Sequence, residues 1–201
     1  MTNTLRTALA ALLLAGAPLL LAPASAQTVT SVVTALDLDK CRHVKGKDVE
    51  DYGEWFCRGL SGIAVYVSAG DQRSYVSYGR DAKNELAARQ TLASFNGEGE
   101  RIEWRVAREP GGKLKPFATI MRWSTTVSTG DEPVRGQVLV VTRLGPGGVC
   151  HVGYVDARAN PDANALAARL ADERARTFKC GADKAVVVGN KGPGFSGPYG
   201  D

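Results

Sequence analysis

The sequence lacks the local motifs that identify most cofactor-dependent and metal-dependent proteins. Its four cysteines form no C-x-x-C pair, and no glycine-rich run matches a phosphate-binding loop or a dinucleotide-binding fingerprint. The segment Gly194–Pro198, GFSGP, lacks the last glycine of the hydrolase pattern G-x-S-x-G. No asparagine begins a glycosylation sequon, and no repeat of fixed period is present. We therefore expect neither a cofactor nor a metal centre.

A strong excess of charge of either sign is also missing. The 25 lysine and arginine residues nearly balance the 21 aspartate and glutamate residues, which leaves a net charge of +4. Because a dedicated nucleic-acid-binding protein concentrates basic residues on one face, we expect no such role. Arginines that recur on predicted strands would form an anion-binding patch if the strand register aligned them, and otherwise a solvated rim. These are Arg101, Arg105, Arg122 and Arg143.

The first 26 residues predict a secretory signal peptide. One arginine within Met1–Arg6 precedes the apolar run Thr7–Pro23, and the small residues Ala24–Ala26 form a cleavage site. The apolar run is short for a membrane span and is interrupted by Pro18, so we expect no span after cleavage. The sequence thus predicts a periplasmic or secreted protein, with residues 27–188 forming one disulfide-stapled domain.

Apolar patterning predicts an α+β domain built on an antiparallel sheet of about five to seven strands. Short links between successive strands favour antiparallel pairing. Residues 137–142, QVLVVT, are apolar at consecutive positions, which indicates a central strand covered on both faces. The predicted strands cover residues 62–68, 73–78, 101–108, 117–126, 136–144, 149–157 and 184–188.

Two helices are predicted beside the sheet. Asn160 is a good N-cap and Pro161 suits a first helical position, so a helix over about 161–179 is expected to pack on one face of the sheet. A shorter helix is expected over about 82–94, where the apolar stripe is weaker. In residues 189–201, glycine and proline fill 7 of 13 positions, which predicts a flexible tail.

The pairing of the cysteines decides which chemistry is open to the chain. An even number in an exported protein favours disulfides, and four cysteines allow three connectivities. We favour the pair Cys41–Cys57, which brackets one polar loop, and the pair Cys150–Cys180. A strand that begins at Cys150 and a helix that runs back antiparallel to it would place Cys180 beside Cys150, within bonding distance. The alternative is a Cys/His metal or nucleophile site, because both histidines lie near cysteines in sequence. Adjacent strand residues face opposite ways, which argues against Cys150 and His151 binding one ion.

Aromatic side chains gather in the first cysteine loop and in the hairpin that follows it. If exposed, they would form a recognition surface, and if buried, they would serve only the core. The candidate binding residues are Tyr52, Trp55, Phe56, Tyr66, Tyr75 and Tyr78. Carboxylates that could serve a hydrolase are Glu50, Asp51, Glu54 and Glu103, but their separation cannot be read from the sequence.

Together these features favour a non-enzymatic binding or inhibitor module of the cell envelope. Its expected partner is another envelope or extracellular protein. Two alternatives are an envelope hydrolase that uses carboxylates and an assembly or scaffold protein that associates through its Gly/Pro-rich tail. The sequence does not indicate an oligomeric state.

The favoured cysteine pairing makes a direct prediction about free thiols. The protein recovered after export, denatured but not reduced, should show no free thiol by a colorimetric thiol assay. Two or more thiols per chain would contradict the pairing at one or both sites.

Overall fold

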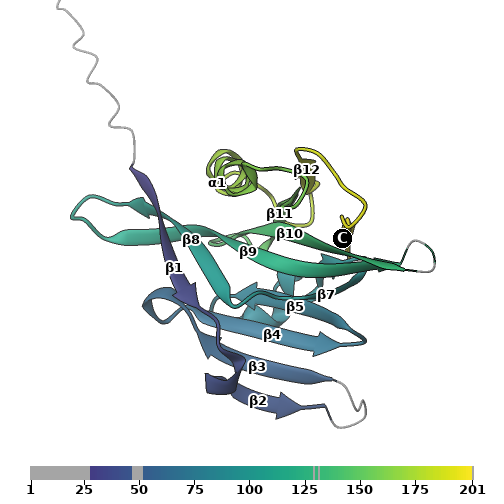
Figure 1. The fold of residues 1–201 in the computed structure, drawn as a ribbon. Helices are drawn as coiled ribbons and strands as arrows, with labels where there is room; N and C mark the ends of the chain where they lie inside the picture. The colour runs from purple at the N-terminus through teal and green to yellow at the C-terminus, as the bar shows by residue number, and fades with distance from the viewer. Residues whose placement is uncertain (1–27, 47–51, 129, 131, 201) are drawn as a thin grey trace, which may run out of the picture.

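The computed structural model describes residues 28–46, 52–128, 130 and 132–200 of the 201-residue chain. The predicted signal peptide lies outside the described residues, as do Glu50 and Asp51. The described chain forms three layers, with a helix above a large sheet and a smaller sheet below it (Figure 1). The α+β class expected from the sequence is confirmed, but the predicted strands at 62–68 and 73–78 belong to a second sheet rather than to one sheet with the others.

The large sheet contains seven of the described strands. Its order is β1 (Val29–Ala35), β8 (Arg101–Arg108), β9 (Leu114–Ser128), β10 (Pro133–Arg143), β11 (Cys150–Asp156) and β12 (Val186–Val188), and β7 (Phe95–Gly97) also pairs with β9. The small sheet has the order β2 (Arg42–Lys45), β3 (Gly53–Arg58), β4 (Ala64–Gly70) and β5 (Arg73–Tyr78). A two-stranded ladder joins β6 (Thr91–Leu92) to β13 (Pro198–Tyr199).

Both faces of the large sheet are covered by apolar layers. On β10, Leu139 and Val141 pack toward the helix α1 (Ala163–Arg174), and Val138 and Val140 pack toward the small sheet. Strand β10 lies between β9 and β11, so the prediction of a central strand buried on both sides is confirmed.

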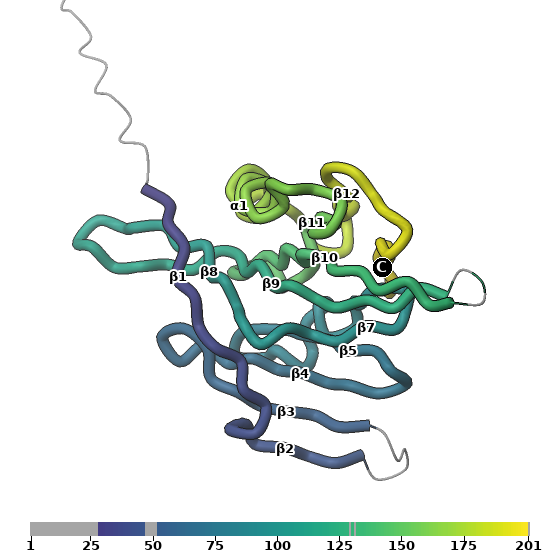
Figure 2. The backbone as a smooth tube through the Cα atoms, in the orientation of Figure 1, coloured from purple at the N-terminus to yellow at the C-terminus, as the bar shows by residue number. Residues whose placement is uncertain are grey.

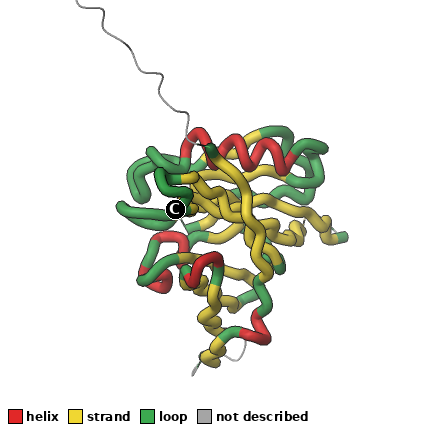
Figure 3. The backbone as a smooth tube through the Cα atoms, turned by 90° about the vertical axis from the view of Figure 1, so that its left-hand side faces the viewer, coloured by secondary structure: helices red, strands yellow, loops and turns green. Residues whose placement is uncertain are grey.

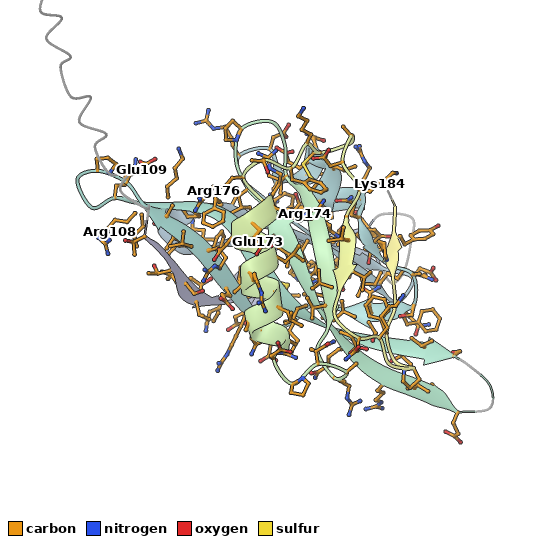
Figure 4. All side chains as sticks on the ribbon, turned by 90° about the horizontal axis from the view of Figure 1, so that it is seen from above. Arg108, Glu109, Glu173, Arg174, Arg176 and Lys184 are labelled. Atoms are coloured by element: carbon orange, nitrogen blue, oxygen red, sulfur yellow. A yellow bond between two sulfur atoms is a disulfide. The ribbon has the colours of Figure 1, made fainter. Side chains whose placement is uncertain are left out.

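The last strand corrects the expectation of a purely antiparallel sheet. Strand β12 pairs parallel with β11, with Tyr154 opposite Val187. The intervening helix α1 carries the chain back across the sheet, and such a crossover returns the next strand parallel to the first. Viewed from above, α1 lies across the large sheet (Figure 4). The sheet is therefore mixed.

Helix α1 is shorter than the predicted 161–179 and begins two residues later. Its N-cap is Asp162, because the side chain of Asn160 is used elsewhere: it donates to the carbonyls of Asp156 and Asn190 at 2.9 and 2.8 Å. Ala167 and Leu170 face the sheet, as the apolar stripe indicates.

The predicted helix over 82–94 is wrong. That segment forms two 3₁₀ turns, η3 (Ala82–Asn84) and η4 (Leu86–Arg89), and then strand β6. Its polar groups form hydrogen bonds with Val149, which precedes β11, and with β11 itself. Ala87 N donates to the Val149 carbonyl at 2.9 Å, and the Gln90 side chain accepts from His151 N at 2.8 Å. These tertiary hydrogen bonds compete with the local pattern of a helix.

The segment 189–200, predicted as part of a flexible tail, lies against the domain instead. Pro198 and Tyr199 pair with β6, and Ser196 Oγ accepts a hydrogen bond from Ser94 N at 2.8 Å. Gly194 O accepts from Thr125 Oγ1 at 2.8 Å. From β12 the tail, drawn in yellow, loops back toward β10 and ends close to it (Figure 2). Glycine suits this course because it allows close approach of the two backbones.

Both favoured disulfides are present. Cys41 and Cys57 are joined with a Cα–Cα distance of 4.7 Å, and Cys150 and Cys180 with 5.7 Å. The segment between the first two cysteines, expected to be a polar loop, contributes β2 and most of β3. The pair of disulfides is typical of a non-cytoplasmic protein.

Close packing between β11 and α1 predicts that Gly153 is needed at its position. A Cβ atom there would lie 2.5 Å from the Val186 carbonyl oxygen and 2.8 Å from Leu170 Cδ2. Gly153→Ala should lower the free energy of unfolding by about 1–3 kcal/mol, measured by urea denaturation. The control is Gly97→Ala on β7, where the added carbon would meet only Ser124 Oγ at 3.4 Å. Equal stability of the two variants would contradict this account.

Candidate functional site

Strand alternation divides the candidate aromatic residues between the two faces of the small sheet. We call the face turned away from the large sheet the outer face. It carries Tyr52, Phe56, Tyr66 and Tyr75. Phe56 on β3 lies opposite Tyr66 on β4, and Glu54 on β3 lies opposite Ser68 on β4, which in turn lies opposite Tyr75 on β5. Trp55 and Tyr78 point inward and pack in the core. The structure therefore brings together four of the six predicted binding residues. In the side view of Figure 3, the small sheet forms the lower part of the molecule.

These outer-face aromatics differ in accessibility. Tyr66 is 4% exposed, whereas Tyr52 is 36% exposed. Phe56 and Tyr75 are half-buried, and the rings of Phe56 and Tyr66 lie 5.4 Å apart at a tilted angle. A partner can reach Tyr52, Phe56 and Tyr75 without any rearrangement of the core.

Glu54 is the polar centre of the outer face. Its Oε1 accepts hydrogen bonds from the Tyr52 and Tyr66 hydroxyls at 2.9 and 2.8 Å. Lys83, from η3, lies 2.7 Å from Oε1 and donates to Oε2 at 2.9 Å. Burial disfavours the charged carboxylate, but the hydrogen bonds from Lys83, Tyr66 and Tyr52 outweigh it and lower the pKa of Glu54.

The same contacts shift the pKa values of the groups around Glu54. Burial, and then hydrogen bonds with Tyr52 and Glu54, raise the pKa of Tyr66. The hydrogen bond to Glu54 also raises the pKa of Lys83. Glu54 is therefore a charged, three-fold hydrogen-bonded group that fixes the positions of two tyrosines and a lysine.

A basic cleft opens beside Phe56. We give this name to a cavity of about 480 Å³ lined by Leu36, Lys40, Arg42, Phe56, Arg58 and the Cys41–Cys57 disulfide, with Ala35 and Asp37. The guanidinium carbon of Arg42 lies 4.0 Å from the centre of the Phe56 ring. Both Arg42 and Arg58 are exposed, and neither forms an ion pair with a carboxylate in the described part of the chain.

Four cationic side chains of this region, Lys40, Arg42, Arg58 and Lys83, were not among the predicted binding residues. Arg42 follows Cys41 and Arg58 follows Cys57, so the predicted disulfide could have placed the two arginines together. Lys83 gave no such signal, because the segment containing it was expected to form a helix rather than a turn over the small sheet.

A second cleft is acidic. This acidic cleft has a volume of about 640 Å³ and lies between residues 35–39 and 98–101. The carboxylates that line it are Asp37, Asp39, Glu98 and Glu100, with Arg101 beside them. Asp37 is bound to Lys40 at 2.7 Å.

The carboxylates singled out in the sequence do not meet. Glu54 lies on β3 of the small sheet, and Glu103 lies on β8 of the large sheet, where it accepts a hydrogen bond from Ser31. The register places the four arginines of the possible anion-binding patch on the face of the large sheet that α1 covers, where three of them are engaged in local contacts. Arg122 donates to the side chains of Asn164 and Gln137. Arg105 binds Asp172 at 2.5 Å, and Arg143 donates to the carbonyls of Ala175 and Pro146.

The Cys150–His151 pair forms no reactive site, because Cys150 is in a disulfide. His151 is 1% exposed, and its Nδ1 lies 2.9 Å from the Tyr154 hydroxyl. Burial lowers the pKa of His151 to about 3, so the ring is neutral at physiological pH. The adjoining cavity, about 50 Å³, has room for little more than a water molecule.

Within residues 28–46, 52–128, 130 and 132–200, no three His, Cys, Asp or Glu side chains lie close enough to hold a metal ion. No helix in the same residues is long and apolar enough to cross a membrane. No protein-family model, curated protein or solved structure shows significant similarity to the chain.

The geometry around Glu54 predicts a pH-dependent contribution to stability. Because the folded pKa lies below the ordinary value of 4.5, this contribution is present above that pH and is lost as pH falls through the folded pKa. Glu54→Gln should lower the free energy of unfolding by about 1–3 kcal/mol at pH 7 and by much less at pH 3. The control is Glu173→Gln, an exposed position on α1. A pH-independent difference between wild type and Glu54→Gln would contradict the assignment.

Proposed function

We propose that the protein is a non-enzymatic binding or inhibitor module of the cell envelope, periplasmic or secreted, which binds an acidic segment of another envelope or extracellular protein. The binding surface comprises the outer face and the basic cleft. The signal-like leader and the two disulfides support the location.

One observation carries this proposal: exposed cations that have no carboxylate partner among the described residues lie beside accessible aromatic rings. Arg42 and Arg58 flank Phe56 at the cleft, and Tyr52 continues the aromatic surface. Arginine and aromatic side chains are enriched at the energetic centres of protein interfaces. Guanidinium groups also pair well with carboxylates, which favours an acidic segment.

The scaffold is suited to present this surface rigidly. The Cys41–Cys57 disulfide ties the chain before β2 to β3, and Glu54 holds Tyr52 and Tyr66 through their hydroxyls. Preorganised side chains lose less conformational entropy when a partner binds.

An envelope hydrolase is the alternative that one feature favours, namely the four carboxylates of the acidic cleft. Such an enzyme would need one carboxyl to act as an acid and another as a base or nucleophile. Glu98→Gln and Glu100→Gln would then abolish turnover of envelope polymers without weakening capture of a protein partner.

The proposed binding surface predicts a specific loss of partner capture. A photo-crosslinking amino acid placed at Tyr75 should trap an envelope or extracellular protein during expression in the native host. The double variant Arg42→Ala/Arg58→Ala should reduce the yield of this adduct about tenfold, because both cations toward the acidic segment are removed. The adduct yield is measured by immunoblot.

Arg169→Ala provides the matched control, since this exposed arginine lies on α1 above the opposite face of the large sheet. The control should retain the wild-type yield. An undiminished adduct in the Arg42→Ala/Arg58→Ala double variant would refute the assignment of this surface.

A further inference from the structure

Strand β1 is an open edge of the large sheet. It pairs with β8 on one side, and no other described strand pairs with it. Its seven residues make it a long edge, and Val33, next to the central residue, is 57% exposed. An open edge presents a row of backbone donors and acceptors to any strand that can reach it.

The register shows which backbone groups face outward. Arg108 N donates to the Thr28 carbonyl, and Leu36 N donates to the Glu100 carbonyl, so the even-numbered residues bond to β8. In an antiparallel ladder the alternate residues point their N–H and C=O groups the other way. Those residues are Val29, Ser31, Val33 and Ala35.

The composition of β1 leaves this edge unprotected. Natural edge strands are usually blocked by charged side chains, proline or a short length. One edge strand of the small sheet, β2, follows this rule with four residues that include Arg42 and Lys45. Strand β1, VTSVVTA, has no charge and no proline.

We propose that β1 pairs antiparallel with β1 of a second copy of this chain, about a two-fold axis at Val32. This register places Val29 opposite Ala35 of the second copy and Ser31 opposite Val33 of the second copy. Every outward backbone group of β1 then finds a partner, for about eight hydrogen bonds in all. The two large sheets become one continuous sheet.

Charge complementarity favours a second copy in this register. Ser31 lies opposite Arg105 on β8, and Val33 lies opposite Glu103. If Ser31 pairs with Val33 of the second copy, one row of residues crosses the four strands in the order Arg105, Ser31, Val33 of the second copy and Glu103 of the second copy. Arg105 of one copy and Glu103 of the other therefore lie in the same row. Opposite charges, not like charges, therefore share the row of Ser31 and Val33, and the two-fold axis repeats this match once on the other side of Val32. This interface uses the large sheet and is independent of the proposed function.

The test is the mass in solution of the exported protein, measured by light scattering after size exclusion. Wild type at tens of micromolar should have the mass of two chains. Val33→Pro should halve it, because proline removes an outward N–H but no bond to β8. Val33→Lys should also halve it, since it places like charges near the two-fold axis. Val44→Lys on β2, 39% exposed, is the matched control and should keep the double mass.

A cross-link tests the register itself. Residues at position 32 of the two copies form a non-hydrogen-bonded pair with Cα atoms about 4.5 Å apart, which suits a disulfide. Val32→Cys should migrate at twice the chain mass on a non-reducing gel, and Val44→Cys should not. A single-chain mass for wild type, a double mass for both Val33 variants, or equal cross-linking at 32 and 44 would each overturn the proposal.

Discussion

Burial of both faces of the large sheet is the constraint on which the rest of the structure depends. Because β10 is apolar on consecutive residues, neither side of the strand can face water without exposing Val138 and Val140 or Leu139 and Val141. Helix α1 covers one side and the small sheet covers the other (Figure 1). The small sheet is thus held by its inner face, and its outer face is left to carry polar and aromatic side chains. The position of the proposed binding surface follows directly from this layering.

The polar groups of the outer face are arranged to hold a surface in place. Glu54 combines a charged carboxylate with three donors, which offsets the cost of burying it. The two arginines at the basic cleft have no such partners among the described carboxylates. This contrast between a satisfied acid and accessible cations distinguishes the structural part of the face from the part that can bind. The open edge of β1 is a separate feature, and it could double the number of binding surfaces in one assembly.

Some of the fold could be predicted because the controlling interactions are local. Strand β8 was predicted with its observed bounds, since apolar and polar residues alternate along Arg101–Arg108. The hairpin of β4 and β5 was predicted because two alternating segments, residues 62–68 and 73–78, are joined by a short link. The disulfides were predicted because chain geometry limits which cysteines can meet. The prediction of a helix over 82–94 was wrong because the controlling interactions there are not local. Hydrogen bonds to Val149 and His151, far away in sequence, decide the conformation of this segment.

The sequence by itself indicated the alternating strands from β8 to β11 and the hairpin of β4 and β5, favoured one pairing of the cysteines, and showed that aromatic residues gather in the first cysteine loop and hairpin. Only the tertiary structure decided which of those aromatics are accessible, because the two faces of a strand differ only in what packs on them. It likewise decided that β12 is parallel, that the Gly/Pro-rich tail pairs with β6, and that Arg42, Arg58 and Phe56 share one cleft. These features depend on contacts between distant segments, and no local pattern of residues encodes such contacts.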